Sequence, residues 1–157
     1  MNAESISVTH AGIIDLHSPL DRTAIDRAWE NTKRKNPFLH AKWSAGFIKN
    51  IPVDKSKPEF VQCSVNEFEQ YFNKSANMKV DSSRLMVCEA GLTVQIIVIT
   101  PHSLADGTSM MLILHDLLTF YENPHLSQAL VTEYPVAAMH LFPLLDSKKV
   151  EEFKVKL

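Results

Sequence analysis

The segment Leu92–Thr100, LTVQIIVIT, constrains the fold more than any other part of this chain. Apolar residues occupy both its odd and its even positions, whereas a strand with one face in water alternates apolar with polar residues. The segment therefore predicts a strand that is buried on both faces. Such a strand lies in the interior of its sheet, so other strands must pair with it on both sides.

The remaining segments alternate between strand-like and helix-like patterns. The β-branched run at residues 6–16 is typical of a strand, and Gly91 permits a tight turn before the apolar run. In residues 20–35 and 107–123, apolar side chains recur at three- and four-residue steps, which indicates helices with one buried face. We expect strands at residues 6–16, 38–48, 60–63, 84–90 and 92–100, and helices at residues 20–35, 65–73 and 107–123.

Length and charge narrow the possible partners. The 157 residues suit one domain, 1–157, and 16 Lys+Arg against 18 Asp+Glu leave a formal net charge of -2. Because these charges are scattered, we expect no nucleic-acid or anionic-membrane partner. No apolar run reaches the ~18 residues of a membrane span, and the first ten residues do not resemble a signal peptide. We therefore expect a cytoplasmic protein without a membrane span.

Three further patterns have structural interpretations. Cys63 and Cys88 lie in apolar, strand-like segments and form no CxxC pair, so we expect reduced, buried thiols. The basic triplet Lys33–Lys35 falls at the end of a predicted helix, where positive charge complements the helix dipole. Residues 125–157 form an apolar tail interrupted by two prolines. The pattern of this tail assigns it only weakly to secondary structure, and the one element that it predicts is a short final helix after Asp146.

The motif Pro101–Gly107, PHSLADG, joins the apolar strand to the next helix. It places His102 at the carboxyl end of a buried strand. Ligands of open α/β sheets bind in the crevice beyond such strand ends, beside the N-termini of the helices that follow. His102 is therefore the principal candidate for chemistry.

The motif resembles the HHxxxDG signature of the chloramphenicol acetyltransferase-like superfamily, which includes nonribosomal condensation domains and wax ester synthases. Pro101 stands in place of the first histidine, and His102 matches the second. The resemblance covers about residues 6–121, where the order of strands and helices matches the amino-terminal half of the family's fold. It implies an α/β domain of the α+β two-layer sandwich type, in which helices pack on a mixed β-sheet.

The resemblance also implies a function. Members transfer an acyl group from coenzyme A or a carrier-bound thioester to a hydroxyl, amine or thiol, and the histidine that matches His102 is the general base. The residue that matches Asp106 forms a structural ion pair with an arginine, and the candidates for that arginine here are Arg22, Arg27 and Arg84. Asp106 could instead cap the helix that follows. Either role is architectural. Gly107 would shape the substrate channel.

Other kinds of site lack the necessary patterns. A Ser-His-Asp triad that used Ser103 would need a nucleophile elbow such as GxSxG, and no spacing nominates a set of metal ligands. His115 and Asp116 resemble the dyad of HD phosphohydrolases, but that class needs further histidines at fitting positions. Gly-rich phosphate loops are missing as well. We therefore expect no metal and no permanently bound cofactor, with the acyl thioester as a co-substrate.

Members of the family have two similar halves with the substrate channels between them, and 157 residues are too few for both. The chain could be a fragment, a half that needs a second-half partner or self-association, or a relative that keeps only a binding cleft. Because monomers seldom expose large apolar patches, the apolar tail favours a homo-oligomer or a second-half partner. Two functions remain open: an acyltransferase-like domain, and a catalytically inactive binding or assembly module.

Overall fold

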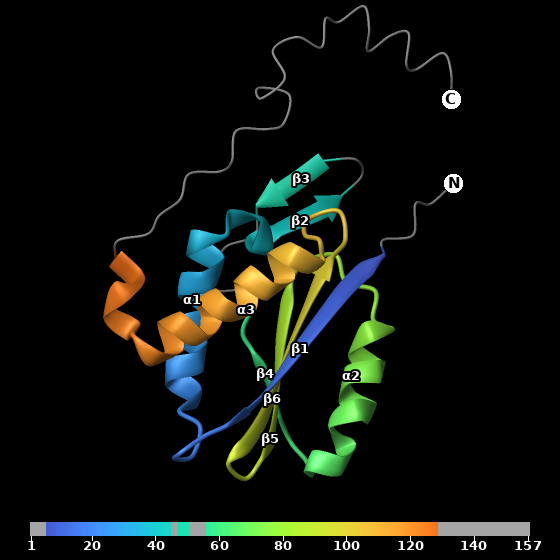
Figure 1. Ribbon diagram of the computed structural model, residues 1–157. Helices are drawn as coiled ribbons and strands as arrows, with labels where there is room; N and C mark the ends of the chain where they lie inside the picture. Colours follow the sequence, from blue (N-terminus) through green and yellow to red (C-terminus); the bar gives the residue numbers. More distant parts are fainter. Residues whose placement is uncertain (1–5, 45–46, 51–55, 129–157) are drawn as a thin grey trace, which may run out of the picture.

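In the computed structural model, which describes residues 6–44, 47–50 and 56–128, four strands form a sheet in the order β1-β6-β5-β4 (Figure 1). β1 pairs antiparallel with β6 and β6 with β5, whereas β4 pairs parallel with β5, so the sheet is mixed. A separate hairpin joins β2 and β3. The strands are β1 (Ser7–Asp15), β2 (Ala41–Ser44), β3 (Phe47–Asn50), β4 (Glu59–Gln62), β5 (Arg84–Ala90) and β6 (Thr93–Pro101).

The predicted central strand is confirmed. β6 lies between β1 and β5, and each of its residues from Val94 to Pro101 is buried. Gly91 has a φ of 67°, a left-handed conformation that glycine adopts without steric cost, and it forms the tight turn between β5 and β6. The apolar character of both faces of β6 thus reflects a layer of helices on each side.

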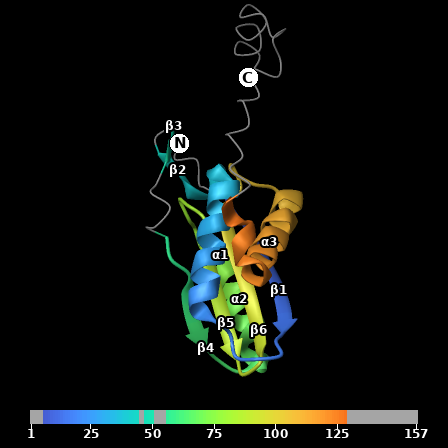
Figure 2. The same ribbon diagram turned by 90° about the vertical axis from the view of Figure 1, so that its left-hand side faces the viewer.

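Helices cover both faces of the sheet. α1 (Arg22–Lys35) and α3 (Gly107–Glu122) pack on one face, and α2 (Phe68–Ala76) packs on the other (Figure 2). The core under α1 and α3 contains Trp29 and Leu117, both fully buried, and the smaller core under α2 contains Phe68. This arrangement confirms the α/β class and the mixed sheet packed by helices.

Three expectations need correction or lie outside the described residues. Residues 37–40 form a 3₁₀ helix instead of the first part of a strand, because Pro37 occupies its first turn and favours a helical start. Only β2 and β3 remain of the strand expected at residues 38–48. The apolar spacing at residues 107–123 also places Met111 on the buried face of its helix, but Met111 is 59% exposed. The final helix expected after Asp146 lies outside the described residues.

The C-terminal end of α1 is joined to α3 by a buried carboxylate. Asp116, on α3, is 7% exposed; it accepts a hydrogen bond of 2.6 Å from the Lys35 ammonium and one of 3.0 Å from the Asn36 amide. The fully buried Lys33 donates to the backbone carbonyl of Ser56 at 2.9 Å. The basic triplet thus does lie in the last turn of α1, but two of its lysines also make specific tertiary contacts.

We predict that Asp116→Ala lowers the free energy of unfolding by about 2 kcal/mol, because it removes two charge-assisted hydrogen bonds from a buried site. Urea denaturation would measure the loss. The matched control is Met111→Ala, a change at an exposed residue of the same helix, which should alter stability by less than about 0.5 kcal/mol. Equal effects of the two variants would show that the Asp116 contacts contribute nothing specific.

Candidate functional site

His102 follows directly on the last residue of β6 and begins a tight turn that leads into α3. Its backbone N–H donates to the Ile6 carbonyl at 2.7 Å, and the Leu104 N–H donates to the Pro101 carbonyl at 2.9 Å. The first contact extends the pairing of β1 with β6 by one hydrogen bond beyond the strand end. The backbone of His102 is thereby held in place while its side chain is exposed at the sheet end.

The imidazole ring is oriented by the same turn. Its Nδ1 lies 3.3 Å from the Ala105 carbonyl oxygen. A carbonyl oxygen can only accept a hydrogen bond, so this contact favours the tautomer that carries its proton on Nδ1. In that tautomer the lone pair of the neutral ring is on Nε2, the nitrogen that could take a proton from a substrate.

Asp106 is the N-cap of α3. Its carboxylate accepts a hydrogen bond of 2.8 Å from the Ser109 N–H. This bond is the main cause that lowers the pKa of Asp106 below its usual value, and the nearby His102 adds a smaller effect in the same direction. Among the described residues no arginine pairs with Asp106. Arg22, one of the three candidate arginines, pairs instead with Glu89 at 2.8 Å, and the capping role of Asp106 is the one observed.

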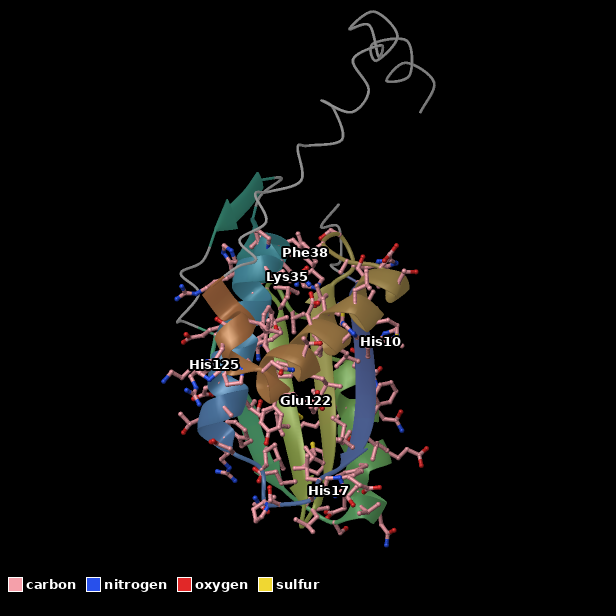
Figure 3. All side chains as sticks on the ribbon, turned by 60° about the vertical axis from the view of Figure 1, so that its left-hand side comes forward. His10, His17, Lys35, Phe38, Glu122 and His125 are labelled. Atoms are coloured by element: carbon pink, nitrogen blue, oxygen red, sulfur yellow. The ribbon has the colours of Figure 1, made fainter. Side chains whose placement is uncertain are left out.

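Gly107 is not required by the packing of the protein. A methyl group added at this position would meet only the His10 Cε1 atom, at 3.9 Å, which is an ordinary contact distance. His10 lies on β1 beneath the start of α3 (Figure 3). If Gly107 serves to leave space, that space is therefore open to a ligand and is not filled by the neighbouring protein atoms.

The surface around His102 is open and partly apolar. Ile6, whose carbonyl binds the His102 backbone, is 69% exposed, and Leu112, on the helix α3 that follows the loop, is 62% exposed. His102 lines none of three pockets found among the described residues, which lie beside Leu118, Trp29 and Arg84. The described part of the chain therefore presents the imidazole on an uncovered surface.

The cysteines do not compete with His102 as reactive groups. Cys63 and Cys88 are both free; Cys88 is buried as expected, whereas Cys63 is only half-buried, and desolvation is the main cause that raises the pKa of each thiol, that of Cys88 to about 12. Both are therefore protonated at neutral pH and weak nucleophiles.

In the ranges that the structure describes, no three His, Cys, Asp or Glu side chains are grouped as metal ligands. None of the helices there is long and apolar enough to cross a bilayer.

Sequence analysis missed the backbone groups that hold the site. The carbonyls of Ile6 and Ala105 orient His102, but a carbonyl has no signature in the sequence because every residue carries one. It also missed the contact of Asp116 with Lys35 and Asn36. These partners are about 80 positions apart in the chain, and no local pattern connects them.

Comparison with known proteins identifies the fold. The first condensation domain of the calcium-dependent antibiotic synthetase matches 85% of this chain with a TM-score of 0.64 and 18% identity. The cyclization-docking bidomain of EpoB from Sorangium cellulosum matches 94% with a TM-score of 0.64 and 14% identity. The X-domain of teicoplanin biosynthesis, solved in complex with OxyB, matches 84% with a TM-score of 0.63 and 15% identity.

These likenesses establish that the chain has a condensation-domain-like fold. The chain spans only 35%, 32% and 30% of the three matched chains, about a third of their length. Its sequence matches no protein-family model and no curated protein sequence. The fold is thus shared with part of a condensation domain.

We predict that Asp106→Ala lowers the melting temperature modestly because the first turn of α3 loses its side-chain cap, whereas Asp106→Asn retains an acceptor and has a smaller effect. Thermal unfolding monitored by circular dichroism would measure both.

The pH dependence separates charge from hydrogen bonding at this cap. Because the pKa of Asp106 is lowered in the folded state, its charge stabilises the protein at pH values above the usual value of about 4, and this stabilisation is lost as the pH falls through the lowered pKa. The advantage of the wild type over Asp106→Asn should therefore disappear in acid. An advantage that persists there would contradict the assignment.

Proposed function

We propose that this chain is an acyltransferase-like domain with His102 as its general base. It transfers an acyl group from coenzyme A or a carrier-bound thioester to a hydroxyl, amine or thiol. The observation that carries the proposal is the ring contact of 3.3 Å with the Ala105 carbonyl, which leaves Nε2 as the acceptor nitrogen of an exposed imidazole. The condensation-domain-like fold and the HxxxDG spacing of the loop support it.

The chemistry follows from the chosen tautomer. Nε2 of His102 takes the proton of the acceptor as the acceptor attacks the thioester carbonyl, and a tetrahedral intermediate forms. When that intermediate collapses, the carbon–sulfur bond breaks, and the imidazolium returns the proton to the departing thiolate. No redox partner and no metal are needed for this balance. Pro101 stands where the HHxxxDG signature has its first histidine. His102, which matches the second histidine, is still present to act as the base.

His102 alone would be an incomplete catalyst. The developing oxyanion needs hydrogen-bond donors, and the loss of one such donor typically costs ~10²–10³ in rate. The exposure of His102, of Ile6 next to it and of Met111 and Leu112 on the first half of α3 supports a covering subunit. We therefore propose that a second half, or a second copy of this chain, closes the site and supplies the missing groups.

The proposal predicts that the purified chain releases thiol from at least one member of a panel of acyl-CoAs in the presence of amine, alcohol and thiol acceptors. His102→Ala should reduce the rate by ~10²–10⁴, the usual contribution of a positioned base. The matched control is His115→Ala. It removes the exposed imidazole of His115, which lies on α3, and should leave the rate unchanged. If neither the wild type nor the variant exceeds the uncatalysed rate, the chain is not an enzyme on its own.

Self-association can be tested separately by sedimentation velocity. We expect a dimer or larger assembly at micromolar concentration, and Leu112→Glu should shift it to the monomer because it places a charge on an exposed apolar residue of α3, the helix that follows the His102 loop. Leu92→Glu is the control, since Leu92 is also exposed but lies at the β5–β6 turn, at the other end of the sheet. A strict monomer for the wild type would contradict assembly with a second copy.

A second candidate function is a binding module without catalysis. The specific observation in its favour is the likeness to the X-domain, which was solved in complex with OxyB and has the same fold. In this alternative the surface around His102 binds a protein partner, and His102 contributes contacts without proton transfer. The thiol-release assay separates the two functions, because a binding module would leave the rate at the uncatalysed level for both histidine variants.

A further inference from the structure

We propose that the pocket beneath the C-terminal end of α3 binds a small organic ammonium ion with an apolar body, such as a short primary alkylamine or an arylalkylamine. The pocket has a volume of about 200 Å³ and opens between the end of β1, the start of β6 and the last turns of α3. His102 follows the opposite end of β6, so this site is separate from the proposed catalytic surface.

The walls of the pocket are aliphatic. Ile14 of β1 and Ile96 of β6 line the sheet side, Ile25 of α1 lines a second side, and Leu118 of α3 lines a third. Protein interiors are close-packed and contain few voids larger than a water molecule. An apolar cavity of about 150 Å³ is known to stay dry and to bind benzene, so this pocket has room for one ring or a chain of about six carbons.

The polar residues of the pocket carry negative charge. Asp15 and Glu122 contribute carboxylates, and the lining includes neither lysine nor arginine. His17 and Tyr121 complete the polar part, and Figure 3 shows His17 just beyond the end of β1 and Glu122 on α3. This combination of aliphatic walls and two carboxylates selects a ligand with an apolar body and a cationic head.

Two of these polar groups are already positioned. One oxygen of Asp15 accepts a hydrogen bond of 2.7 Å from the Thr93 hydroxyl, and the carboxylate keeps further acceptor capacity for a ligand. The Tyr121 hydroxyl accepts from the Asp21 N–H at 3.3 Å and can still donate its own hydrogen. Asp15 and Tyr121 are therefore held in place by contacts within the fold.

The test uses three probes of equal chain length: hexylammonium, hexan-1-ol and hexanoate. Isothermal titration calorimetry on the full chain should show saturable binding of hexylammonium, weaker binding of hexanol, and the weakest or no binding of hexanoate. A melting temperature that rises with the hexylammonium concentration would confirm that the folded state binds it. Equal affinities for the three probes, or no saturable binding of hexylammonium, would overturn the proposal.

Variants locate the site. Glu122→Gln should weaken hexylammonium binding by about fivefold, as expected for one solvent-screened charge, and leave hexanol binding unchanged. Glu69→Gln removes the same charge from α2 on the opposite face of the sheet and should change neither. Leu118→Trp fills the pocket and should abolish binding of both probes. A folded Leu118→Trp variant with unchanged affinity would disprove this location.

The proposal does not depend on the acyltransferase function. His102→Ala should leave hexylammonium affinity unchanged because His102 lies beyond the other end of β6. Loss of thiol release without loss of amine binding in this variant would therefore separate the two sites. Loss of hexylammonium binding in His102→Ala would overturn the assignment of the amine to the pocket under α3.

Discussion

The antiparallel pairing of β1 with β6 is the interaction on which the candidate site depends. It runs over nine residue pairs, from Ser7 with Pro101 to Asp15 with Thr93, and the hydrogen bond between Ile6 and His102 continues it into the loop. Because β6 is buried on both faces, a shift of one residue in this register would turn its side chains to the opposite faces. The register therefore determines both the core and the place where the imidazole leaves the sheet.

The two ends of the sheet have different characters. At the carboxyl end of β6, an exposed histidine is held by backbone groups at the start of α3, and the apolar surface around it is uncovered. At the other end, α3 and α1 close over a pocket with acidic groups among its polar residues. Strand β6 and helix α3 both run between these ends. The length of β6 and α3 thus separates the surface proposed for a partner from the pocket proposed for a small ligand.

The buried contact of Asp116 with Lys35 and Asn36 explains how α3 keeps its position over the sheet. A carboxylate inside a protein is costly unless it is paired and hydrogen-bonded, and Asp116 meets both conditions through the end of α1. This contact gives His115–Asp116 a structural meaning, in place of the dyad that the dipeptide resembles. It also assigns Lys35 a tertiary partner in addition to its favourable position near the helix dipole.

The sequence by itself determined the elements whose patterns are local. The two apolar faces of β6, the three- and four-residue spacing in α1 and α3, and the glycine turn at Gly91 each follow from the conformational preferences of a few adjacent residues. It also placed His102 at a strand end. Only the tertiary structure decided which nitrogen of that ring is free, which arginine pairs with which carboxylate, and where a pocket remains. Those outcomes depend on groups far apart in the chain, and backbone carbonyls and packing gaps leave no pattern in the sequence.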